Sequence, residues 1–191
     1  MTVSINQLAS DVAILLGEAL ARECRPHESP FPDLEDKVRV MAPGLLEELI
    51  MKAKPEDLTD SKRASPPVTI DRSGIVILSL PEDYLRAVYI RMSDWKRPVT
   101  QVTAPSDPGF DRQSSPWHGI RGSQERPVAI EGVGKTGARI LQLFSSGSDA
   151  TLDSFIYSPR PALGATDTLE IPVALYPTLL NELMIKLGAE G

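Results

Sequence analysis

The segment of this sequence closest to a catalytic motif is the run AIEGVGKT at residues 129–136. It fits the loose form of a phosphate-binding loop, with alanine in place of the first glycine. In such a loop Lys135 would reach the outer phosphates of a nucleotide and Thr136 would hold magnesium. The residues that follow read as two strands and a terminal helix, without the alternating strands and helices of a nucleotide-binding sheet. We therefore expect a β-hairpin that turns at residues 132–137, and nucleotide binding through Gly134-Lys135-Thr136 is the alternative.

Other residue types with chemical potential do not form a recognisable constellation. His27 and His118 are far apart in the sequence, and Cys24 is the single cysteine, so neither a zinc motif nor an internal disulfide is indicated. Glu47 and Glu48 are adjacent in an expected helix and would point to different faces. No serine lies in a Gly-x-Ser-x-Gly pattern. We expect a non-enzymatic protein with no catalytic, cofactor-binding or metal-binding residue.

Tryptophan and arginine placement points to protein–protein contacts instead. Trp95 and Arg97 lie close together in the sequence, and Trp117 is followed shortly by Arg121. Tryptophan and arginine are the residues most enriched at interface hot spots. The four residues are therefore candidates for a subunit or partner interface, and burial of Trp95 in a β core is an equal alternative.

The two ends of the chain are predicted to be amphipathic helices. Ser4 and Gln7 form a capping box for the first helix, which Pro26 ends. Apolar residues recur at helical spacing in the last segment, from about residue 172 or 177 to Leu187. Gly188 is well placed as the C-terminal cap of that helix.

A second helical region is predicted from about residue 33 to residue 54. Pro43 lies inside it, and proline removes a backbone donor and disfavours the helical conformation of the residue before it. Proline is also well suited to the first position of a helix. We therefore expect two helices at an angle, at about residues 33–42 and 43–54.

After a polar linker the apolar pattern changes to a period of two, which is typical of β-strands. The expected strands are residues 68–70, 75–80, 84–92, 128–131, 140–144 and 152–157. The first two flank the turn sequence Asp71-Arg72-Ser73-Gly74. The loop at residues 104–126 is long and rich in proline, serine and glycine. We expect it to be mobile in the free protein and to become ordered between neighbouring copies.

Together these elements predict an α+β fold in three parts. Residues 1–60 form a helical bundle part, and residues 61–171 form an antiparallel β-sheet or sandwich part. Residues 172–191 form an amphipathic helix that packs back on the helical part, because every amphipathic stripe needs a partner.

Charge is unevenly distributed along the chain. The net charge is −6, with −6 in residues 1–60, +4 in residues 61–145 and −4 in residues 146–191. This pattern fits either compensation within one fold or a basic surface that meets an acidic surface of the next copy. No Lys/Arg cluster indicates free nucleic-acid binding, and no signal peptide or membrane-spanning stretch is apparent. We expect a soluble protein that does not enter a membrane.

Several short sequences occur in an order that carries a family resemblance. They are DKVRVMAP at residues 36–43, LPEDYLR at 80–86, WKRPV at 95–99, RG at 121–122, RPV at 126–128, YSPR at 157–160 and LEIP at 169–172. In this order of elements, residues 33–188 resemble the head-to-tail connector (adaptor) proteins of tailed bacteriophages.

The resemblance implies a structural protein of the virion neck or tail, assembled in the cytoplasm of a bacterial host. Such proteins form a ring of about twelve copies beneath the portal. The implied partners are further copies, the portal protein and tail proteins, and DNA would pass through the ring without sequence-specific binding. A tail-completion protein or another non-enzymatic protein-binding module is the alternative.

Overall fold

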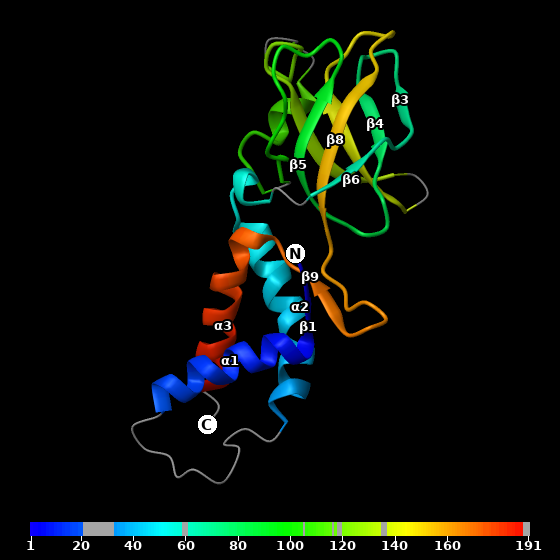
Figure 1. The fold of residues 1–191 in the computed structure, drawn as a ribbon. Coiled ribbons are helices and arrows are strands. Elements are labelled where there is room, and N and C mark those ends of the chain that lie inside the picture. Colours follow the sequence, from blue (N-terminus) through cyan, green and yellow to red (C-terminus); the bar gives the residue numbers. More distant parts are fainter. Residues whose placement is uncertain are drawn as a thin grey trace. The chain divides into compact units, whose positions relative to one another are not determined.

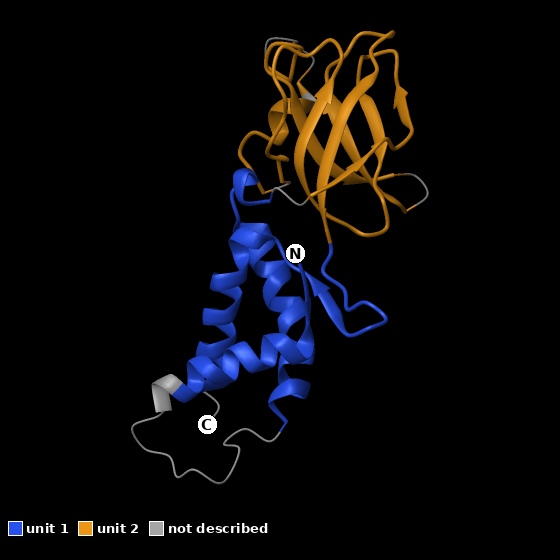
Figure 2. Cartoon of the chain, in the orientation of Figure 1, with its two compact units in different colours: residues 1–60, 160–191 blue, residues 61–159 orange. Residues whose placement is uncertain are grey.

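A computed structural model describes residues 1–20, 33–58, 61–104, 106–115, 117, 120–134 and 137–188. The chain divides into two compact units (Figure 2). The helical unit contains residues 1–60 and 160–191, and the β unit contains residues 61–159. The expected α+β class is confirmed, with helices and antiparallel sheets in one chain.

The described residues of the helical unit form three α-helices, and each contacts the other two (Figure 1). They are α1 (Ile5–Leu20), α2 (Leu34–Lys52) and α3 (Tyr176–Gly188). Each helix turns an apolar stripe inward, and the fully or almost fully buried residues include Leu8, Val12, Leu46, Ile50, Leu179 and Leu183. The prediction that the C-terminal helix packs back on the helical part is therefore confirmed. Two short 3-10 helices, Pro55–Asp57 and Val173–Leu175, accompany these helices.

The first turn of α1 shows half of the expected capping box. The backbone N–H of Gln7 donates to the Ser4 hydroxyl at 3.1 Å. The side-chain amide of Gln7 does not return to Ser4, because it donates to the Asp11 carboxylate at 2.8 Å. A hydroxyl acceptor alone satisfies one of the free donors at a helix N-terminus.

The prediction of two angled helices around Pro43 is wrong, because α2 continues through it. Pro43 cannot donate to the Arg39 carbonyl, which in a helix interior costs about 3 kcal/mol. Val38, Ala42 and Leu46 lie on one stripe that spans this position, and all three are completely buried. Burial of that stripe against α1 and α3 favours a continuous helix over the local preference of proline.

A two-stranded sheet belongs to the helical unit and was not expected from the sequence. Strand β1 (Thr2–Ser4) pairs antiparallel with β9 (Thr168–Glu170), with Val3 opposite Leu169. Both of these apolar residues are buried. The β part therefore ends at residue 159 rather than at residue 171, and the segment from 160 onward belongs with the helices.

The β unit contains two antiparallel sheets. One has the strand order β2-β8-β5, and the other has the order β3-β4-β7-β6. The strands are β2 (Lys62–Ala64), β3 (Val68–Ile70), β4 (Val76–Ser79), β5 (Tyr84–Met92), β6 (Val128–Val133), β7 (Arg139–Phe144) and β8 (Leu152–Pro159). Buried residues from both sheets form one hydrophobic cluster, which includes Leu78, Ile90, Leu141 and Phe155. This is the expected sandwich-like arrangement.

The turn between β3 and β4 forms as its sequence predicts. The Asp71 carboxylate accepts hydrogen bonds from the backbone N–H groups of Ser73 at 2.8 Å and Ile75 at 3.0 Å. Gly74 has a φ of 79°, and a Cβ there would lie 2.7 Å from the Ser146 carbonyl oxygen. Glycine is required at this position both for the backbone conformation and for the close approach.

The two ends of the β unit lie next to each other. Lys62 in β2 is the cross-strand partner of Tyr157 in β8. The chain therefore enters and leaves the β unit through neighbouring strands. This arrangement allows the whole β unit to be an insertion between the two segments of the helical unit.

Candidate interaction surface

The loop between β5 and β6 borders an open hollow with a volume of about 980 Å³. Three basic side chains line it, Arg112, Arg121 and Arg126, and we call it the arginine hollow. Ile120 and Glu125 also contribute to its lining. Arginine presents a planar fork of donors that matches carboxylates, so this is a surface suited to acidic groups.

Hydrogen-bonded turns organise the described part of this loop. It contains a 3-10 helix, Asp111–Ser114, which carries Arg112. The Gln113 side chain accepts from the backbone N–H of Gly122 at 2.8 Å and donates to the Gly109 carbonyl at 3.4 Å. These bonds tie the two sides of the hollow together. The predicted mobility of the loop in the free protein, and its ordering on assembly, stay predictions.

The loop is also attached to the four-stranded sheet. The backbone N–H of Thr103 donates to the Ala129 carbonyl at 2.8 Å, beside β6. On the return path, a Cβ at Gly122 would lie 2.7 Å from the Phe144 carbonyl oxygen. The arginine hollow therefore rests on a fixed edge of the β unit, and Gly122 permits the close approach.

Two large apolar side chains of the same loop are exposed. Trp117 is 72% exposed and Ile120 is 53% exposed. The Trp117 carbonyl accepts hydrogen bonds from the N–H groups of Ile120 and Arg121, so one turn carries all three residues. Exposed tryptophan next to arginine is the composition of an interface anchor.

The prediction that Trp95 belongs to an interface is wrong, and the alternative, that it is buried in the β core, is confirmed. Its side chain is 2% exposed and belongs to the hydrophobic cluster of the β unit. The indole N–H donates to the Ser145 carbonyl at 2.9 Å. A buried indole needs such a partner, and a backbone carbonyl beside β7 supplies it.

Arg97 is exposed, and its positive charge acts on Glu125 in the lining of the arginine hollow. The Lys96 side chain forms an ion pair with Glu125, and the backbone N–H of Lys96 donates to the Gln124 carbonyl at 2.9 Å. The Lys96 ammonium holds the pKa of Glu125 below its ordinary value, and Arg126 and Arg97 add to this effect. The structure thus places Trp117 and Arg121 on one turn, leaves Arg97 exposed and buries Trp95 in the β unit.

Arg121 also lies within electrostatic reach of the β3–β4 turn. The Ser73 hydroxyl is the main cause of the lowered pKa of Asp71, against an opposing effect of partial burial. Backbone N–H groups and the positive charge of Arg121 lower it further. The charges of Arg121 and Asp71 therefore attract each other.

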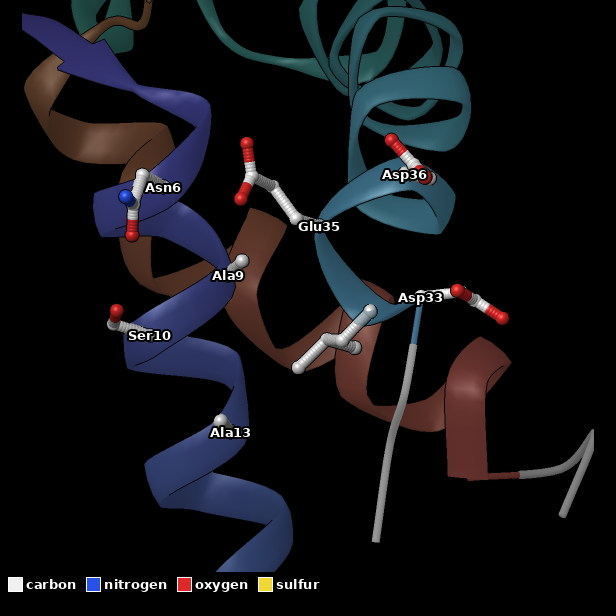
Figure 3. A pocket seen from close by; sticks show the side chains of 8 residues that line it. Asn6, Ala9, Ser10, Ala13, Asp33, Glu35 and Asp36 are labelled. Atoms are coloured by element: carbon white, nitrogen blue, oxygen red, sulfur yellow. The ribbon is translucent and has the colours of Figure 1, made fainter. Parts of the chain in front are cut away.

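A second hollow, of about 440 Å³, lies in the helical unit between α1 and the first turn of α2. Ala9 and Ala13 contribute short side chains to it, and the Glu35 carboxylate lies in the gap between the helices on the side of Asn6 (Figure 3). Asp33 and Asp36, which also line this hollow, are exposed as well.

Arg39 balances part of this acidic group. Its guanidinium pairs with Glu35 at 3.0 Å, with Asp36 at 2.6 Å and with Asp167 at 3.1 Å. Arg39 therefore pairs with three carboxylates, while Asp33 adds a fourth acidic residue and Lys37 a second basic residue at the same end of the helical unit. This end of the helical unit keeps a net negative charge.

A cluster of three hydrogen-bonded polar side chains at the start of β5 was not expected from the sequence. The Asp83 carboxylate accepts from the Lys62 ammonium and from the Tyr157 hydroxyl, both at 2.8 Å. Partial burial opposes ionisation, but these two hydrogen bonds hold the pKa of Asp83 below its ordinary value of 3.8. Burial, followed by the hydrogen bond to Asp83, raises the pKa of Tyr157 to about 12. The group joins the start of β5 to β2 and β8, which is a structural role.

The phosphate-loop resemblance at residues 129–136 falls in a hairpin, as expected. Strands β6 and β7 are antiparallel neighbours, and Val133 lies opposite Arg139. The backbone N–H of Gly134 donates to the Ala138 carbonyl at 2.8 Å. A phosphate-binding loop leads from a strand into a helix, whereas this segment leads into a second strand. Lys135 and Thr136 themselves lie outside the described residues.

The residues that could bind a metal do not form a metal site in the part of the chain that the structure describes. Within that part, no three histidine, cysteine, aspartate or glutamate residues are grouped so that they could hold a metal ion. His27, His118 and Cys24 lie outside it. No helix among the described residues has both the length and the hydrophobicity needed to cross a membrane.

The sequence indicated Trp117 and Arg121 as interface candidates, which stays a prediction, and did not indicate Arg112 and Ile120, which line the hollow with Arg121. The signal was available in part, because Arg112, Arg121 and Arg126 all lie in the one long loop. The three arginines line a single hollow because the loop folds back on itself through the hydrogen bond between Gln113 and Gly122. No short sequence pattern predicts this hydrogen bond. The sequence matches no protein-family model and no curated protein.

Proposed function

We propose that this chain is a head-to-tail connector (adaptor) protein of a tailed bacteriophage. It is a non-enzymatic structural protein of the virion neck. Copies of it form a ring of about twelve that joins the portal to the tail and lets DNA pass. The proposal is supported by the order of sequence features that resemble this family and by two compact units that offer unlike surfaces.

The observation that carries the proposal is the separation of charge between the two units. The two acidic ends of the sequence fold into one unit, which contains 8 basic and 16 acidic residues and has a net charge of −8. The β unit contains 12 basic and 10 acidic residues and has a net charge of +2. Unlike surfaces on one chain favour head-to-tail contacts between copies, and such contacts close into rings when the rotation allows.

A tail-completion protein, or another protein-binding module, would use the same surfaces with a different partner. The decisive experiment mixes the purified chain with portal rings and with tail proteins from the same phage. Electron microscopy should show a ring of this chain seated on the portal. Binding to tail tips without binding to the portal would favour the tail-completion function, and binding to neither would reject both.

Assembly should also change the loop at residues 104–126. Hydrogen exchange of its backbone amides should be fast in the free chain and slowed in the portal-bound ring, because ordering a loop between copies restricts it. Strong and equal protection in the free chain and in the ring would contradict the proposed role of the loop.

A further inference from the structure

We propose that the arginine hollow, together with the exposed Trp117 and Ile120, is the docking site for the acidic helical unit of a second copy of this chain. This inference rests on the proposed ring function and names the surfaces that would join its subunits. The contact is heterologous, since the β unit of one copy receives the helical unit of the next.

The hollow concentrates positive charge. Arg112, Arg121 and Arg126 line it, while Glu125 is the acidic residue in the lining and is already paired with Lys96. The positive charge of Arg97 also acts on Glu125. An occupant must therefore bring negative charge.

The apolar residues indicate a protein surface as the occupant. Trp117 and Ile120 are both more than half exposed on the turn that precedes Arg121. A small inorganic anion would leave both side chains in water. A protein partner would bury them, and tryptophan and arginine are among the residues most enriched at interface hot spots.

Charge complementarity points to another copy of the chain. The helical unit has a net charge of −8, and four carboxylates gather where α2 begins, three of them paired with Arg39. Of these, Asp33, Glu35 and Asp36 are exposed and fall within four residues. The hollow and this acidic end lie on different units, so neither surface is used up by an isologous contact.

The loop presents the arginines in a defined arrangement. Gln113 bridges Gly109 and Gly122 across the hollow, and Thr103 anchors the loop to Ala129. These hydrogen bonds define the arrangement of the arginines that docking of a second copy would stabilise.

The test uses the full chain and two complementary charge variants. The hollow variant carries Arg112→Glu and Arg121→Glu, and the helix variant carries Glu35→Arg and Asp36→Arg. Self-association of each is followed by ¹⁵N NMR at low salt, from about 20 μM to about 1 mM, a range that detects even millimolar affinity. Arg63→Glu is the matched control, because Arg63 is an exposed arginine on β2 away from the hollow.

The wild-type chain should show concentration-dependent shifts at residues 33–36 and 106–126. Each charge variant alone should lose them, whereas an equimolar mixture of the two variants should regain them. In the mixture, the intact helical unit of the hollow variant can dock on the intact hollow of the helix variant. Trp117→Ala should weaken self-association at least about tenfold, and Arg63→Glu should leave it unchanged.

Several results would overturn the inference. They are the absence of concentration-dependent shifts at these residues in the wild-type chain, undiminished self-association of the hollow variant, and no recovery in the mixture. Shifts at residues 106–126 with duplex DNA but not with the chain itself would assign the hollow to phosphates instead. Circular dichroism of each variant shows whether it is folded.

The same variants separate this inference from the proposed function. A hollow variant that still forms rings on the portal would remove the docking site and leave the connector function standing. A wild-type chain that self-associates through the hollow but ignores the portal would keep the docking site and remove the function.

Discussion

The two units of this protein are built by opposite rules of chain connectivity. The helical unit is assembled from distant segments, since β1 pairs with β9 and α3 packs on α1 and α2. The β unit is one continuous segment. Each unit has its own buried apolar residues, centred on Leu46 and Leu183 in one and on Leu141 and Phe155 in the other. This difference indicates that the inserted β unit is a self-contained module. The helical unit, in contrast, depends on contacts between segments that are far apart in the sequence.

The largest expected effect tests whether the two units are independent. Leu183→Ala removes a completely buried side chain from α3 and should lower the free energy of unfolding by roughly 2–5 kcal/mol. The loss should appear in the helical transition seen by far-ultraviolet circular dichroism. Trp95 fluorescence, recorded in a Trp117→Phe background, should report an unchanged transition of the β unit.

Leu141→Ala is the matched change in the β unit, because Leu141 is also completely buried. It should shift the Trp95 transition and leave the helical one in place. If either substitution moved both transitions equally, the two units would unfold as one cooperative body and the comparison would fail.

The next effect sharpens the contrast between the two tryptophans of the β unit. Trp95→Phe should lower the free energy of unfolding by about 1–3 kcal/mol, because it leaves the buried Ser145 carbonyl without its indole donor and opens a small cavity. Trp117→Phe should change it by less than about 0.5 kcal/mol, as expected for an exposed residue. Urea denaturation measures both, and equal losses would contradict the two placements.

A smaller effect concerns the point where the chain enters and leaves the β unit. Asp83→Asn should reduce stability at pH 7 by less than about 1 kcal/mol, because the carboxylate is partly exposed and its attractions are screened. The pKa of Asp83 is lowered in the folded state, so its stabilisation is present above 3.8 and is lost as the pH falls below that value. The difference between wild type and variant, measured by urea denaturation, should therefore shrink towards zero on acidification. A difference that grows at low pH would have the wrong sign.

The smallest effect concerns the segment that resembles a phosphate-binding loop. Lys135→Ala should leave stability and assembly nearly unchanged, because a charge in a hairpin connection contributes little. Calorimetric titration with ATP should give no binding heat for either form. ATP binding by the wild type that Lys135→Ala abolishes would replace the structural function with the nucleotide-dependent alternative.

Sequence patterns predicted the β unit better than the ends of the helical unit. Strand β5 was expected at residues 84–92 and is found there, since most of its apolar residues are buried while Arg86 and Arg91 are not, although register shifts interrupt a strict alternation. Strands β1 and β9 have three residues each, too few to show a period, and their pairing is decided by burial of Val3 and Leu169 in the tertiary structure. The prediction of a helix break at Pro43 failed for a related reason. The local preference of proline against a helix interior is outweighed by the packing of the helix on both sides of it.

The candidate surface shows the same limit. Trp117 and Arg121 could be chosen as interface candidates by residue type, but residue type alone made Trp95 an equally good candidate. Exposure separates the two tryptophans, and exposure depends on the sheets that fold around Trp95. The hollow itself depends on hydrogen bonds between residues 109, 113 and 122, which bring Arg112 to the side of Arg121.

The insertion of the β unit also sets an order of events during synthesis. All strands of the β unit have been made by residue 159, so this unit can complete its sheets while the chain is still attached to the ribosome. Helices α1 and α2 are made first but cannot complete their core until α3 follows at residues 176–188. For that interval their apolar stripes have no final partner and are open to chaperones or to a neighbouring nascent chain. The part of the protein that is made first is thus the part that matures last.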